Sequence, residues 1–149
     1  LFELALRILG SRSETAHALA MPAGRAYGIA RLLVELPALW AQGRVLIPET
    51  RLAAAGLSLA DVQAGVPRER LEPVIEGLID QVRRDLDEAR QRQGQLDRVQ
   101  HAALLPLAVV EPYLRALRRT TRDPLREPLQ LAPIRRVWAL WWSHVSGRF

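Results

Sequence analysis

The sequence contains no cysteine, no lysine and few aromatic residues, which make up 5% of the chain. The lack of cysteine excludes disulfides, thiolate metal sites and a cysteine nucleophile, and it is compatible with a reducing cytoplasm. Because lysine is absent, all 21 basic residues are arginines, a usage typical of GC-rich bacterial genomes. Long apolar stretches are missing as well. Residues 102–110 are interrupted by Pro106 and are far shorter than the roughly 20 residues that span a bilayer. We therefore expect a cytoplasmic protein.

The residues that are present favour helices. Hydrophobic residues make up 49% of the chain, alanine, leucine and arginine are abundant, and β-branched residues are few. A chain of 149 residues is long enough to bury one core, so we expect a single all-α domain over residues 1–149. The net charge of +5 favours anionic partners. No nucleic-acid recognition motif accompanies this charge, and we expect no nucleic-acid binding.

The first third of the chain is expected to be helical. Apolar residues recur at helical spacing over residues 1–9, and Gly10 is expected to end that helix. Ser13 is a suitable N-cap for the next helical segment. Pro22 is expected to restart the helix, because proline is tolerated in a first turn. Pro37 lacks an N–H group and clashes with the preceding turn, so we expect the segment to kink or end there.

The longest expected helix covers residues 68–93 and ends at Gly94. Its apolar residues fall on one face at 100° per residue, namely Leu71, Val74, Ile75, Leu78, Val82, Leu86 and Ala89. Glu76 and Asp80 are spaced i, i+4 like a metal pair but lie on the charged face. We interpret them as members of solvated ion pairs.

The C-terminal third is expected to hold two more helices. One covers residues 97–119, with bends at Pro106 and Pro112, and the other begins near residue 132, with Trp138 and Trp141 in the core. The histidines have no ligand spacing. A cluster of arginines fits a solvated helix end, with binding of a phosphate or a lipid headgroup as the alternative. These residues are His17, His101 and His144, and Arg115, Arg118, Arg119 and Arg122.

One segment carries a family pattern. Residues 24–48 read GRAYGIARLLVELPALWAQGRVLIP, with Gly43-Arg44 followed by Leu46-Ile47-Pro48. This segment resembles the second signature of the squalene and phytoene synthases. In that family a helix ends in Asn-x-x-Arg-Asp-x-x-x-Asp, and a short spacer, Gly-Arg and an apolar-Pro pair follow.

The register of that resemblance assigns each motif position to a residue. The family's first aspartate falls at Glu35, the second at Leu39, the arginine at Val34 and the asparagine at Arg31. In the family, two carboxylates at i and i+4 face a second pair and hold the Mg²⁺ ions that bind a diphosphate. One carboxylate cannot form that pair, so we expect lost activity and no cofactor. Arg31 and Arg44 are the candidate diphosphate-binding residues.

The resemblance implies the isoprenoid-synthase-like helical bundle. It covers the C-terminal half of that fold, so we expect the chain to lack the N-terminal half and its own aspartate-rich motif. The altered motif is most similar to the branch of the family that includes a phytoene-synthase-like mitochondrial complex I assembly factor. It therefore implies an assembly or accessory factor, peripheral to the inner membrane, with an isoprenoid or lipid ligand or a membrane-associated protein partner. The sequence does not indicate an oligomeric state.

Two alternatives stay open. The first is an active transferase that condenses two isoprenyl diphosphates, with Mg²⁺ as cofactor and Glu35 as a metal ligand. The second is a lipid-surface binding module. Trp142 is expected to face away from Trp138 and Trp141 and could lie at a membrane interface beside Arg135 and Arg136.

Overall fold

The structure is a computed structural model that describes residues 1–149 except 12, 95, 98, 120–137, 139 and 144–149. The described residues contain helices and no strand, which confirms the all-α prediction. The helices in chain order are α1 (Phe2–Ile8), α2 (Glu14–Ala41), α3 (Glu49–Ala54), α4 (Leu59–Ala64), α5 (Arg68–Gln93), the 3₁₀ helix η1 (Gln100–Val109) and α6 (Val110–Arg119).

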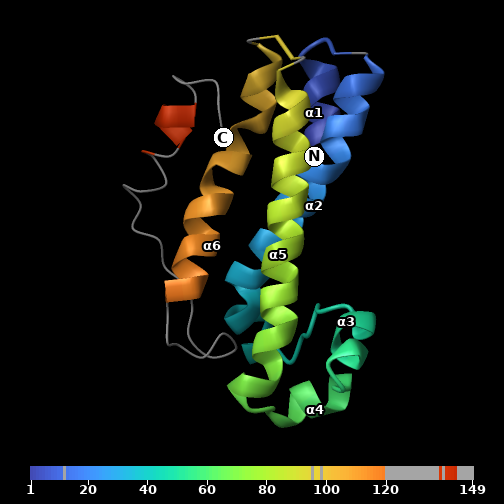
Figure 1. Ribbon diagram of the computed structural model, residues 1–149, viewed down its shortest axis with the longest axis vertical. Helices are drawn as coiled ribbons and strands as arrows, with labels where there is room; N and C mark the ends of the chain where they lie inside the picture. Colours follow the sequence, from blue (N-terminus) through green and yellow to red (C-terminus); the bar gives the residue numbers. More distant parts are fainter. Residues whose placement is uncertain (12, 95, 98, 120–137, 139, 144–149) are drawn as a thin grey trace.

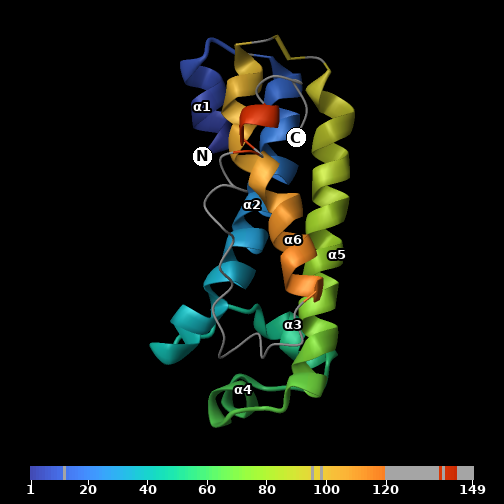
Figure 2. The same ribbon diagram turned by 90° about the vertical axis from the view of Figure 1, so that its left-hand side faces the viewer.

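The two long helices, α2 and α5, form the centre of the bundle. They run side by side in opposite directions, and their contact is more extensive than that of any other pair of described elements. Helix α6 lies along α2, while α1 and η1 lie at one end of the bundle and α3 and α4 at the other (Figures 1 and 2). One continuous apolar core joins these elements.

The core explains why the long helices form where they do. Every apolar residue predicted for one face of α5 is buried, and the bounds of α5 match the predicted segment. On α2 the buried positions include Ala23, Ala26 and Ala30, each almost inaccessible to solvent. Small residues at such spacing let two helix backbones approach closely. Since packing of an apolar face supplies most helical stability in proteins, burial of these faces stabilises both helices.

Helix α2 is continuous from Glu14 to Ala41, so the predicted restart at Pro22 and the predicted end at Pro37 are wrong, while a kink at Pro37 stays a prediction. Ser13 caps the helix as predicted, because its Oγ accepts a hydrogen bond from the N–H of Ala16 at 3.2 Å. Pro22 and Pro37 both lie inside the helix and are buried. An interior proline costs about 3 kcal/mol. Burial of the α2 apolar face against its neighbours outweighs that cost. A prediction from neighbouring residues alone does not include the stabilisation by this burial.

Helix α2 ends at a left-handed glycine. Gly43 has φ +71°, its N–H donates to the carbonyl oxygen of Trp40 at 2.8 Å, and the N–H of Arg44 donates to the carbonyl oxygen of Leu39 at 2.9 Å. These two bonds form a Schellman cap, which favours glycine at the left-handed position. The Gly-Arg element of the sequence is thus a helix terminator. Ile47 is buried beyond it, and Pro48 precedes α3.

The C-terminal third differs from its prediction. The expected single helix over residues 97–119 is divided into η1, which contains Pro106, and α6, in which Pro112 occupies the first turn. Trp138 and Trp141 were expected in the core, and this is wrong, because they are 62% and 51% exposed. The small Ser143 is buried instead. The remainder of the expected last helix, including Arg135, Arg136 and His144, lies outside the described residues.

No helix among the described residues combines the length and the apolar character needed to cross a bilayer.

Candidate functional site

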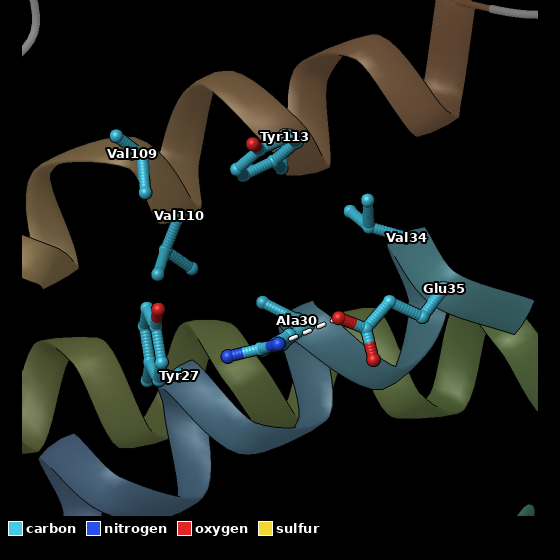
Figure 3. A pocket seen from close by; sticks show the side chains of 8 residues that line it. Tyr27, Ala30, Val34, Glu35, Val109, Val110 and Tyr113 are labelled. Atoms are coloured by element: carbon cyan, nitrogen blue, oxygen red, sulfur yellow. Dashed lines mark hydrogen bonds and ion pairs between the residues drawn. The ribbon is translucent and has the colours of Figure 1, made fainter. Parts of the chain in front are cut away.

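A groove opens between α2 and α6, with a volume of about 360 Å³. Figure 3 shows Val110 and Tyr113 directed from α6 toward α2, across from Tyr27, Ala30 and Val34. The lining residues are Tyr27, Ala30, Arg31, Val34 and Glu35 from α2, Val109 from η1, and Val110 and Tyr113 from α6.

Helical spacing places the α2 residues on this wall. Tyr27, Ala30, Arg31, Val34 and Glu35 recur at steps of three and four, which share one face of a helix. The ring of Tyr27 packs edge-on against the buried Phe2 of α1, with ring centroids 5.8 Å apart. This contact with α1 holds the ring of Tyr27 in its orientation at the groove. The groove therefore exposes apolar and polar surface in similar shares.

One ion pair lies on the groove wall. The Nε of Arg31 donates to Oε1 of Glu35 at 2.8 Å, one helical turn away (Figure 3). The hydrogen bond with Glu35, followed by the charge of Glu35, raises the pKa of Arg31 above its ordinary value. Both side chains are about half exposed. The Glu35 carboxylate is thus already paired with the guanidinium group of Arg31 on the same helix.

A second ion pair of α2, about two turns before the groove pair, joins a half-exposed arginine to a buried carboxylate of α5. Nε and Nη2 of Arg25 donate to Oδ1 of Asp85 on α5, at 3.1 and 2.8 Å. Asp85 is 1% exposed, and its Oδ2 has no hydrogen-bond partner among the described residues. Glu88 approaches Arg25 to 3.5 Å. The hydrogen bond with Asp85 and its charge raise the pKa of Arg25.

The comparison with known families identifies the chain. The family model described as squalene/phytoene synthase matches residues 1–142. The chain belongs to the squalene/phytoene synthase family. The predicted resemblance is thereby confirmed, and the all-α bundle described above is the isoprenoid-synthase-like fold of this family. No curated protein and no solved structure matches the chain in the same comparisons.

The structure brings together only some of the family's motif positions. Arg31 and Glu35 line the groove. Leu39 is half-buried and does not line it, and Arg44 is exposed beyond the end of α2. Arg44 therefore does not join Arg31 in one anion site. The diphosphate-binding roles given to both arginines stay predictions.

The groove residues do not fit the family's metal pair. Mg²⁺ takes oxygen ligands in octahedral geometry and is usually held through more than one carboxylate or phosphate oxygen. Here Glu35 is paired with Arg31, and the position four residues on carries the apolar side chain of Leu39. Among the described residues, no group of three or more acidic or histidine side chains could hold a metal ion.

Other residues singled out in the sequence have structural partners. Glu76 pairs with Arg118 of α6 at 3.0 Å and Asp80 with Arg83 at 3.9 Å, so the ion-pair interpretation is confirmed. Arg115 lies 4.0 Å from Glu111. The ring of His101 lies 2.8 Å from the carbonyl oxygen of Asp97 in the preceding turn. The side chains of Arg119 and His17, and all of Arg122, lie outside the described residues.

Sequence analysis missed the two tyrosines and Asp85. Tyr27 and Tyr113 carry no motif, and they meet only because α6 folds back along α2. Asp85 did carry a signal. It follows Leu78 by seven residues and precedes Leu86, so it falls on the apolar face of α5. A carboxylate at such a position is rarely buried without a cationic partner, which indicates an arginine on the facing helix.

Proposed function

We propose that this family member binds an apolar, isoprenoid-like ligand in the α2–α6 groove and does not release diphosphate from it. The observation that carries the proposal is the pairing of Glu35 with Arg31, together with Leu39 at the second motif position. A carboxylate neutralised within its own helix is a poor metal ligand, and an alkyl side chain is none.

The groove supports a ligand of this chemistry. Its volume of about 360 Å³ lies within the range of about 300–1,000 Å³ usual for small-molecule sites. The alanine and valine side chains and the tyrosine rings on its walls can contact an alkyl or polyene chain through burial of apolar surface, beside the polar groups of the same groove. Tyr27 and Tyr113 add phenol groups that can orient a polar end.

The biological role that fits this chemistry is an assembly or accessory factor at the respiratory membrane. Isoprenoid tails occur in that membrane, and the altered motif resembles the accessory branch of the family. A membrane-associated protein would be the partner.

A diphosphate-release assay tests the loss of chemistry. The purified protein is incubated with Mg²⁺ and geranylgeranyl diphosphate, and released diphosphate is measured for the parent, Glu35→Ala and Glu49→Ala. Glu49 is an exposed carboxylate at the start of α3, outside the groove. We expect no metal-dependent release from any of the three. Release by the parent that Glu35→Ala abolishes and Glu49→Ala retains would establish the rival function, an active Mg²⁺-dependent transferase, which family membership favours.

A binding experiment tests the groove itself. Farnesol, which has the apolar chain without the diphosphate, is titrated calorimetrically into the parent, Val34→Trp and Val99→Trp. Val34 lines the groove, whereas Val99 is exposed and lies outside it. A tryptophan at position 34 occupies the space of the ligand, so we expect a loss of affinity of about tenfold or more. Equal affinities in all three proteins would place the ligand elsewhere.

A further inference from the structure

The charged groups on the wall of the α2–α6 groove balance one another. Among the described residues that line the groove, Arg31 and Glu35 carry the charges, and the others are alanine, valine and tyrosine. Nε of Arg31 donates to Oε1 of Glu35 at 2.8 Å, so the guanidinium and the carboxylate are counter-ions of each other. Arg44 lies beyond the end of α2 and does not line the groove. The described wall therefore presents an arginine whose charge is already compensated.

This pair disfavours a ligand with an anionic end. A diphosphate that approaches Arg31 also approaches the carboxylate of Glu35, and the two negative groups repel each other. If the diphosphate displaced Glu35 from Arg31, an existing charge-assisted hydrogen bond would be lost. Both side chains are about half exposed, so water weakens the repulsion. We therefore expect the pair to lower the affinity for an anionic ligand about tenfold without excluding that ligand completely.

The remaining polar groups of the groove suit an uncharged ligand end. Figure 3 shows Tyr27 on α2 and Tyr113 on α6, on opposite walls of the groove. A phenol can donate one hydrogen bond and accept others, so it pairs with a hydroxyl or a carbonyl group without a charge on either partner. The ring of Tyr27 is held by its edge-on contact with Phe2, at a centroid distance of 5.8 Å. The phenol of Tyr27 is therefore positioned before a ligand binds.

We propose that the groove selects a ligand whose polar end is an uncharged hydroxyl or carbonyl group, and that Glu35 determines this selectivity by neutralising Arg31. The inference rests on the proposed function, because it concerns the ligand of the same groove. It goes beyond that function by naming the chemical class of the polar end and the specificity-determining residue. The ligand class is a long-chain alcohol or carbonyl compound, in preference to the corresponding diphosphate.

Calorimetric titration in metal-free buffer tests the selectivity. The probes are farnesol and farnesyl diphosphate, which share one apolar chain, and the proteins are the parent, Glu35→Gln and Glu3→Gln. Glu3 pairs with Arg7 on α1 at the same i, i+4 spacing and the same 2.8 Å, outside the groove. The two variants therefore make the same change in net charge. We expect the parent to bind farnesol about tenfold more tightly than farnesyl diphosphate. Glu35→Gln should raise the affinity for the diphosphate about tenfold, and Glu3→Gln should not.

Two double variants separate the roles of the polar groups. Arg31→Gln/Glu35→Gln removes the cation as well, so the gain in affinity for farnesyl diphosphate should disappear. Tyr27→Phe/Tyr113→Phe keeps both rings and removes both hydroxyls, and it should bind farnesol about threefold or more weakly. Circular dichroism compares the fold of each variant with that of the parent. The central result is a gain in affinity, which a misfolded Glu35→Gln protein would not give.

The outcomes distinguish this inference from the proposed function. Farnesyl diphosphate binding as tight as farnesol binding in the parent overturns the inference and leaves an apolar ligand in the groove. Equal gains in Glu35→Gln and Glu3→Gln, or a gain that persists without Arg31, also overturn the neutralising role of Glu35. Unchanged farnesol affinity in the tyrosine variant overturns recognition of a hydroxyl end. A parent that binds neither probe overturns the proposed function and the inference together.

Discussion

Helix α2 carries two arginine–carboxylate pairs that differ in burial and in what they connect. Arg25 reaches across to Asp85 of α5, whose side chain is almost inaccessible to solvent. Arg31 binds Glu35 of its own helix, and both side chains are half exposed on the groove wall. The first pair links two helices of the core. The second links nothing beyond one turn of helix, so its residues can change with little effect on folding.

The difference follows from desolvation. A buried carboxylate that loses its cation keeps the cost of leaving water without the compensating attraction, whereas an exposed carboxylate returns to water. Structural importance therefore depends on the burial of the acidic partner, although the two pairs have the same bond length of 2.8 Å.

Arg25→Met gives the largest expected effect. It leaves Asp85 buried with no cation at bonding distance, and we expect a loss of about 2–3 kcal/mol in the free energy of unfolding, below the full cost of breaking a buried pair because Arg25 is itself half exposed. Urea denaturation measures this loss as a lower midpoint. Arg84→Met, at an exposed position of α5, is the control and should stay within about 0.5 kcal/mol of the parent. An equal loss in both variants would contradict the role of burial.

Replacing both partners should restore most of that stability. In Arg25→Met/Asp85→Leu no charge remains buried, and a leucine fills the space between α2 and α5. Replacement of a buried ion pair by apolar residues is often neutral or stabilising, so we expect the double variant to unfold within about 1 kcal/mol of the parent. A double-mutant cycle in urea gives the coupling between the two positions. Losses that simply add would show that Arg25 and Asp85 act independently.

Glu35→Gln should leave stability unchanged. Both members of the Arg31–Glu35 pair are exposed, and water replaces the lost bond, so we expect a urea midpoint indistinguishable from that of the parent. Farnesol affinity should also be retained, since the valine, alanine and tyrosine side chains of the groove are unchanged. A large loss of stability would mean that the groove pair also supports the core, and the contrast between the two pairs would fail.

Features that depend on neighbouring residues could be predicted from the sequence. The apolar face and bounds of α5, the Ser13 cap and the end of α1 near Gly10 follow from local patterns, and the structure confirms them. The Gly-Arg and Ile-Pro elements were enough to indicate the family. These features depend on residues within a few positions of one another, where spacing determines geometry.

The predictions that were wrong depend on distant contacts. Pro22 and Pro37 are helix breakers by local rules, and packing against other elements keeps α2 intact. Trp138 and Trp141 are suited to a core by composition, yet both are more than half exposed, while Ser143 of the same turn is buried. The groove was predictable at Glu35 and Arg31, which carry a motif, but not at Tyr113, whose position depends on the return of α6 along α2.

A final prediction concerns the missing metal pair. Leu39→Asp creates two carboxylates at i and i+4, the spacing of the family motif. We still expect no measurable Mn²⁺ binding by electron paramagnetic resonance, because Arg31 neutralises Glu35 and position 39 lies outside the groove. Adding Arg31→Asn to this variant removes the competing cation and serves as the comparison. Mn²⁺ binding by Leu39→Asp alone would show that the Arg31–Glu35 pair opens readily. Binding only with Arg31→Asn would show that the Arg31–Glu35 ion pair keeps metal from this helix even when the second carboxylate is present.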